Sequence, residues 1–89
     1  MGNEDENLCQ QVPIALTELS NGKSAMVVDL QAQRNALLKF ETLGIIPGVR
    51  IKKISSAILH GPIIVEKDFT KVALGYKMAT KVLVKQIEE

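Results

Sequence analysis

The sequence predicts a mostly β fold, in which about five short strands and one short α-helix form a small barrel. The chain has 89 residues, which is the size of one domain. Hydrophobic residues make up 46% of the chain and aromatic residues only 3%, so Val, Ile and Leu have to build the core, and these residues favour strands. Turn-forming residues divide the chain into short segments. Closure into an SH3-like barrel would remove the strand edges that an open apolar sheet exposes.

The folded part of the chain is expected to begin near Pro13. Residues 1–12 are polar and acidic and are expected to form a flexible tail, which leaves residues 13–89 for the barrel. A tight turn is predicted at Ser20-Asn21-Gly22, because Asn and Gly tolerate positive φ. A strand is predicted over residues 24–30. Its two faces would be Ala25, Val27 and Asp29 on one side, and Met26, Val28 and Leu30 on the other.

Residues 35–43 have helical periodicity. Asn35 is the expected N-cap, and Gly44 is expected to end the helix in the left-handed conformation. Apolar residues at positions i, i+4 and i+7 predict a stripe that faces the core. This stripe consists of Ala36, Phe40 and Leu43, with Leu37 beside it.

The sharpest local prediction is a type II turn directly after this helix. Pro47 fixes φ for the second turn position, and Gly48 supplies the positive φ that the third position requires. Apolar alternation in the next strand breaks at Lys53-Ile54, which predicts a β-bulge. Strands are predicted at 49–54, 62–66, 70–74 and 81–87, with a turn at 67–69 and at most one helical turn at 75–80.

Charge and cysteine content narrow the classes of function. Eleven Lys and Arg balance ten Asp and Glu, which argues against a nucleic-acid-binding protein, and Lys52-Lys53 and Lys81/Lys85 are expected to be solvated surface. Cys9 is the single cysteine, so no internal disulfide forms. No stretch approaches the roughly 18 apolar residues that cross a bilayer, and the acidic N-terminus is unlike a secretory signal. A cytoplasmic protein without direct membrane insertion is expected.

The best candidate for partner binding is the stiff apolar turn at the end of the helix. We expect one of Ile45 and Ile46 to cover the barrel end and the other to be exposed, where an apolar side chain can anchor a partner. Tyr76 and Met78 form a second candidate patch, with core packing as the equal alternative. The candidate partner-binding residues are Leu43, Gly44, Ile45, Ile46, Pro47, Gly48, Tyr76 and Met78.

His60 is the only histidine and the only candidate metal ligand in the ordered region. A metal site requires three or four ligands, so an exposed loop position is the favoured interpretation of His60, and Cys9 lies in the expected tail. The sequence contains no phosphate-binding loop and no credible Ser/His/Asp or Cys/His setting. The chain is therefore not expected to be an enzyme, and no cofactor is certain.

Several segments, in order and at the right spacing, resemble the ferrous iron transport protein A (FeoA) family. They are Ile14 to Leu30, Leu38 to Gly48 with its Leu-Gly-Ile-Ile-Pro-Gly ending, Gly61 to Val65, Val72 to Leu74, and Val82 to Val84. The resemblance covers roughly residues 13–85. Where the family often has a glycine in the turn before its Val-x-Leu strand, this chain has Lys67-Asp68-Phe69-Thr70.

The resemblance implies an SH3-like barrel that binds the cytosolic GTP-binding domain of a ferrous iron membrane transporter and supports iron uptake. Similar barrels form the C-terminal domains of metal-dependent repressors. The alternative is therefore a metal-sensing regulatory barrel that binds Fe²⁺ or a surrogate transition metal ion. The resemblance leaves open whether the protein activates or inhibits the transporter, and a homo-oligomer is compatible with it.

Overall fold

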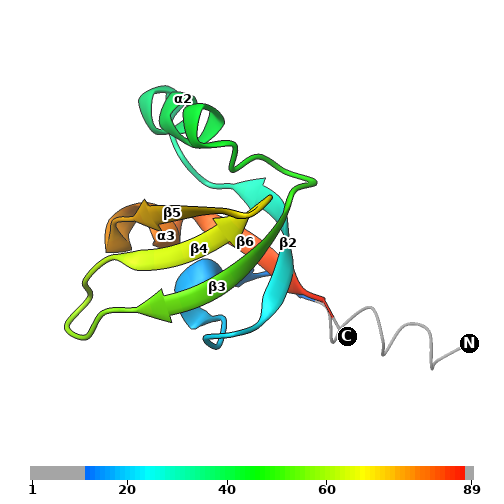
Figure 1. Cartoon of the computed structure of the whole chain (residues 1–89). Helices are drawn as coiled ribbons and strands as arrows, with labels where there is room; N and C mark the ends of the chain where they lie inside the picture. The colour runs from blue at the N-terminus through cyan, green and yellow to red at the C-terminus, as the bar shows by residue number, and fades with distance from the viewer. Residues whose placement is uncertain (1–11, 88–89) are drawn as a thin grey trace, which may run out of the picture.

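The computed structural model describes residues 12–87 and contains one curled antiparallel sheet (Figure 1). Residues 1–11, which make up most of the predicted tail, and residues 88–89 lie outside the described part. Six strands are ordered β1-β6-β2-β3-β4-β5. The elements are β1 (Ile14–Ala15), η1 (Leu16–Glu18), β2 (Ser24–Leu30), α2 (Arg34–Leu43), β3 (Arg50–Ser56), β4 (Ile63–Lys67), β5 (Thr70–Leu74), α3 (Tyr76–Thr80) and β6 (Val82–Gln86).

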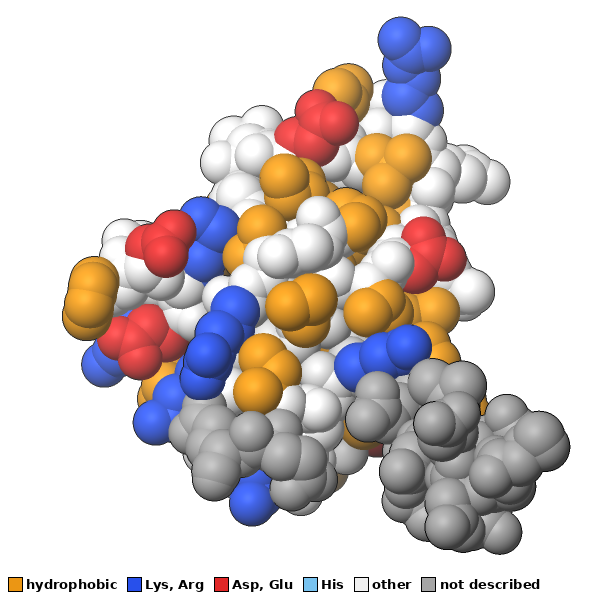
Figure 2. Space-filling view, turned by 90° about the vertical axis from the view of Figure 1, so that its right-hand side faces the viewer, with side chains coloured by type: hydrophobic (Ala, Val, Ile, Leu, Met, Phe, Trp, Pro, Cys, Tyr) orange, Lys and Arg blue, Asp and Glu red, His pale blue; other side chains and the backbone are white. Residues whose placement is uncertain are grey.

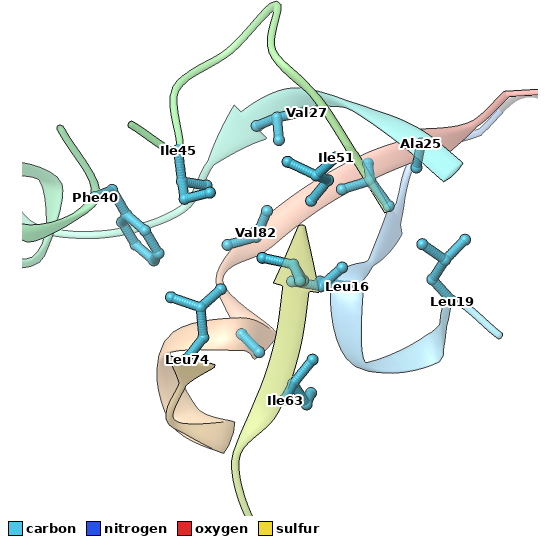
Figure 3. Packing of buried hydrophobic residues seen from close by; sticks show 13 residues of the cluster. Leu16, Leu19, Ala25, Val27, Phe40, Ile45, Ile51, Ile63, Leu74 and Val82 are labelled. Carbon is cyan, nitrogen blue, oxygen red and sulfur yellow. The ribbon is translucent and has the colours of Figure 1, made fainter. Parts of the chain in front are cut away.

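The predicted mostly β fold with one main helix is confirmed. The core is built from inward-facing strand residues, from Leu16 and Leu19 around η1, and from Phe40 and Ile45 at the end of α2 (Figure 3). All four of these side chains are buried, so α2 and η1 close the curled sheet. The strand residues of the core are Ala25, Val27, Ile51, Ile63, Val65, Leu74, Val82 and Val84.

The predicted end of α2 is confirmed and its predicted start is wrong. Gly44 has φ +79°, and Gly48 has φ +95° in a turn closed by a 3.2 Å bond from the Val49 N–H to the Ile46 carbonyl. The helix starts at Arg34 and its N-cap is Gln33, so Asn35 lies inside the first turn. No side chain caps the helix; its first backbone bond runs from the Leu37 N–H to the Gln33 carbonyl at 2.9 Å. Capping preference therefore did not determine this boundary.

Two bulges shift the strand faces. The predicted β3 bulge is present, between Lys53 and Ser55 in the pairing with β4. A second bulge, between Val27 and Asp29 in the pairing with β6, interrupts the alternation expected for β2. As a result Asp29 is exposed, and Leu30 packs against the core instead of sharing the outer face with Met26. The expected placement of Asp29 and Leu30 was wrong, because a bulge inserts one unpaired residue.

Candidate interaction surface

The turn after α2 separates its two isoleucines. Ile45 is fully buried beside Phe40 (Figure 3), whereas Ile46 is 41% exposed in the loop. Pro47 and Gly48 are exposed as well. The expectation that one isoleucine covers the barrel end while the other stays exposed is therefore confirmed. Ile45 fixes the position of the loop, and Ile46 is the side chain of the pair that a partner can reach.

A shallow apolar groove lies between α2 and α3. Its volume is about 290 Å³, and its lining is formed by Leu38, Lys39, Thr42, Leu43 and Met78. Leu38 is 52% exposed and Leu43 is 37% exposed, so the two leucines of α2 present apolar surface that the core does not cover. The structure thus brings together Leu43 and Met78, which the sequence analysis selected separately.

Leu38 belongs to this groove but was not among the predicted site residues. A signal for it was present in the sequence. Leu37 and Leu38 are consecutive, and neighbouring positions on a helix point about 100° apart, so both cannot face the core squarely. In the structure Leu37 is partly buried and Leu38 is exposed.

Tyr76 does not line the groove with Met78. Its ring stacks on the ring of His60, with centroids 4.2 Å apart and planes 15° from parallel. Positions two residues apart on a helix point in nearly opposite directions, which explains why Tyr76 and Met78 serve different surfaces. Both side chains are partly buried and pack against the core, as the alternative to a binding patch predicted.

His60 is exposed in the loop between β3 and β4. Residues 12–87 contain no group of three or more His, Cys, Asp or Glu side chains placed to bind one metal ion. Cys9, the other soft ligand considered, lies outside the described residues. The observed contact of His60 is its stack on Tyr76, which attaches the loop to α3.

Lys53 is a buried cation in the described part of the chain, and the prediction of a solvated position for it was wrong. The residue is only 3% exposed. Its Nζ donates to the carbonyl oxygens of Leu16 at 3.1 Å, Thr17 at 3.1 Å and Leu19 at 2.6 Å. Burial lowers the pKa of Lys53 from its usual value. The bonds join β3 to η1, so this lysine supports the fold and does not belong to a binding surface.

Apolar side chains also gather on the face that includes β2. Figure 2 shows them in a band from α2 at the top down the middle of this face, with charged side chains at its margins. Met26 on β2 and Ile46 are both 41% exposed. The Ile46 loop runs beside β2, because the Gly48 N–H donates to the Val27 carbonyl at 2.7 Å.

Comparison with known families decides the family of this chain. A model described as the FeoA domain matches residues 14–86. The chain belongs to the FeoA family. It is therefore a member of an iron-uptake-related family with an SH3-like fold, as the resemblance implied. No curated protein sequence matches the chain. Residues 12–87 include no helix long and apolar enough to cross a membrane.

Solved structures agree with membership of the FeoA family. The chain is 29% identical to an iron uptake regulatory protein (FeoA), with a TM-score of 0.76 over 84% of this chain and 97% of that one. A FeoA-like protein from Clostridium acetobutylicum has 22% identity and a TM-score of 0.77 over 88% and 91% of the two chains. A manganese-dependent transcriptional repressor has 24% identity and a TM-score of 0.78, but only 42% of that chain is covered. The last two likenesses show a shared fold.

Proposed function

We propose that this protein is a cytoplasmic accessory protein of ferrous iron uptake that binds the cytosolic GTP-binding domain of a ferrous iron membrane transporter. It acts by binding and not by catalysis. Membership of the FeoA family supports the connection with iron uptake. The observation that supports a specific contact is the groove between α2 and α3, lined by Leu38, Leu43 and Met78.

The groove has the chemistry of a recognition site for an apolar side chain. Leu38 and Leu43 expose apolar surface on one helix, and Met78 lies opposite on another. A methionine adapts its shape to a partner because its side chain is unbranched and polarisable. Lys39 at the margin offers a charge for an acidic residue of the partner.

Buried side chains attach both walls of the groove to the barrel, which favours affinity. Phe40 and Ile45 are both fully buried at the end of α2 and fix that helix on the barrel. Ala79 is fully buried and fixes α3 in the same way. A surface that is already ordered loses less conformational entropy on binding.

The test is a pull-down of the transporter's purified GTP-binding domain with the full chain. Leu38→Glu places a charge in the groove at an exposed position, so the fold is expected to persist while binding weakens at least about tenfold. Leu59→Glu is the matched control, because Leu59 is an exposed leucine outside the groove. Ile46→Glu tests whether the loop contributes to the same contact.

Two results would refute the proposal: no capture by the wild-type chain, or unchanged iron uptake in cells after deletion of its gene. If capture survives Leu38→Glu but is lost with Ile46→Glu, the transporter contacts the loop and not the groove.

A further inference from the structure

The turn between β4 and β5 presents an aromatic side chain almost fully to solvent. Lys67 pairs with Thr70, and the two residues between them, Asp68 and Phe69, have φ of +52° and +67°. This is the type I′ geometry, in which glycine or asparagine is favoured because other side chains are strained at positive φ. Phe69 nevertheless occupies this position, and its side chain is 98% exposed. The fold gains no packing from this ring.

Basic residues surround this turn. Arg50 and Lys52 on β3 line one hollow with Asp68 and Phe69, and Lys71 follows on β5. Glu66 faces both Lys52 and Lys71 across the sheet, and Asp68 pairs with the Nζ of Lys67 at 2.9 Å. The surroundings of Phe69 therefore contain four cations and two carboxylates.

The complete chain is close to neutral, with eleven Lys and Arg against ten Asp and Glu and a formal net charge of +1. Attraction to an anionic surface therefore depends on the local cluster of Lys52, Lys67 and Lys71 around this turn.

We propose that the β4–β5 turn is a peripheral membrane contact, in which the Phe69 ring enters the headgroup region of an anionic bilayer. Lys71 and Lys52 then face the lipid phosphates. This inference goes beyond the proposed function and uses a different surface. The combination of an apolar side chain with flanking Lys and Arg is the chemistry by which proteins lie on anionic membranes.

A bilayer fits this turn better than a protein pocket does. Apolar anchors in protein interfaces sit within a wider apolar patch that excludes water. Phe69 stands alone at a projecting turn, and its neighbours in the hollow are mainly charged. Lipid headgroups accommodate such a shape because they rearrange around one inserted ring and bind the surrounding cations at the same time.

The opposite end of β4 supplies a natural control. Ile58 is 85% exposed and Leu59 is 92% exposed in the β3–β4 loop, and Leu59 also has positive φ, at +59°. The sequence has no Lys or Arg from residue 54 to residue 66. This loop therefore resembles the β4–β5 turn in apolar exposure and backbone strain, but its own sequence carries no Lys or Arg.

The experiment is co-sedimentation of the full chain with vesicles of equal parts phosphatidylglycerol and phosphatidylcholine, and with phosphatidylcholine vesicles alone, at low salt. We expect binding to the anionic vesicles only. Phe69→Gly is expected to weaken it about tenfold and Lys71→Gln about fivefold, and about 1 M salt to abolish it. Both variants should remain folded, because glycine tolerates positive φ and Lys71 is exposed.

Leu59→Gly and Leu38→Glu are expected to bind vesicles as the wild type does, which separates this test from that of the transporter contact. The proposal is overturned if the wild-type chain ignores anionic vesicles at low salt, or if Phe69→Gly binds them unchanged. Equal losses for Phe69→Gly and Leu59→Gly would also overturn it. If Phe69→Gly weakens capture of the GTP-binding domain while vesicles are not bound, the turn is a protein contact and the membrane assignment is wrong.

Discussion

The two ends of β4 share an unusual backbone but differ in what surrounds it. Each end has two non-glycine residues at positive φ, which are Leu59 and His60 at one end and Asp68 and Phe69 at the other. Each also exposes at least one large apolar side chain. At the β3–β4 end, the loop is attached to α3 by the His60–Tyr76 stack. At the β4–β5 end, a surface ion pair joins Lys67 to Asp68.

The comparison shows that exposure and strain alone do not assign a role to a turn. Neighbouring charge differs between the ends, since Arg50, Lys52 and Lys71 lie near Phe69 and no basic residue is close in sequence to Leu59. We therefore propose a membrane-binding role for the β4–β5 turn, whereas the β3–β4 loop is held against α3 by the stack of His60 on Tyr76. Substitutions that affect the two ends alike or separately test this difference.

The largest effect is expected from Lys53, because its side chain is buried and β3 pairs with β4 between the two ends. Lys53→Met removes three hydrogen bonds to the carbonyls around η1 and takes this donor away from the buried carbonyls of Leu16 and Leu19. We expect the free energy of unfolding to fall by about 3 kcal/mol, measured by urea denaturation. Amide exchange should quicken at both ends of β4 alike. A loss below about 1 kcal/mol would show that this lysine does not fix η1 on β3.

Lys53 also predicts a pH dependence. Burial lowers its pKa in the folded chain below the ordinary 10.5. Between the lowered value and 10.5 the unfolded chain binds more protons at this site, so its contribution to stability increases as the pH rises. The stability difference between the wild type and Lys53→Met should therefore widen toward alkaline pH. A constant difference would contradict the lowered pKa.

Gly61 tests the packing of the β3–β4 end. A Cβ at Gly61 would lie 2.6 Å from the Cβ of Ala57, closer than real side chains approach. Gly61→Ala is expected to lower the free energy of unfolding by about 2 kcal/mol, because the loop has to move. Ala57→Gly in the same molecule removes the contact and should restore most of the loss. If the double variant is no better than Gly61→Ala, the clash is not the cause.

Gly44 ends α2 and lies beside the side chain of Lys67, the last residue of β4, so a substitution there tests the β4–β5 end. A Cβ there would lie 3.2 Å from Cε of Lys67, a flexible side chain that can move, so backbone strain at φ +79° is the main effect. Gly44→Ala is expected to lower the free energy of unfolding by about 1 kcal/mol. Adding Lys67→Ala should leave that loss nearly unchanged, unlike the rescue expected at Gly61. A clear rescue would mean that contact with Lys67 outweighs strain.

The smallest effects are expected from relieving strain in the turns themselves. Phe69→Gly and Leu59→Gly each replace a side chain at positive φ and should raise the free energy of unfolding by about 0.5 kcal/mol, since the relief exceeds the added chain entropy. Thermal denaturation measures both. Similar gains would show that the ends differ in surroundings and not in strain. Destabilisation by Phe69→Gly would indicate that the ring contributes to folding.

Local features were predicted well from the sequence, because they depend on a few neighbouring residues. The bounds of β2, the left-handed Gly44 and the Pro47-Gly48 turn follow from alternation and from residues with restricted or permissive φ. The bulge that exposes Asp29 was missed, because it depends on the pairing of β2 with β6 and leaves no trace in the β2 sequence.

The interaction surfaces were only partly predictable. The groove joins Leu38 to Met78, 40 positions apart, and such contacts require the tertiary structure. Lys53 was detectable in principle: adjacent residues of a strand point to opposite faces, so Lys52 and Lys53 cannot both face solvent on a half-buried strand. The unusual turn at Lys67-Asp68-Phe69 was visible in the sequence, but the exposure of Phe69 and its basic surroundings required the fold.

Binding of the transporter at the groove between α2 and α3 can be tested by an NMR titration of the isotope-labelled full chain with the transporter's GTP-binding domain. We expect the largest shifts of the amide signals at Leu38, Leu43 and Met78, with smaller ones at Ile46. Absence of any shift, or shifts confined to Ile58, Leu59 and His60, would contradict this expectation.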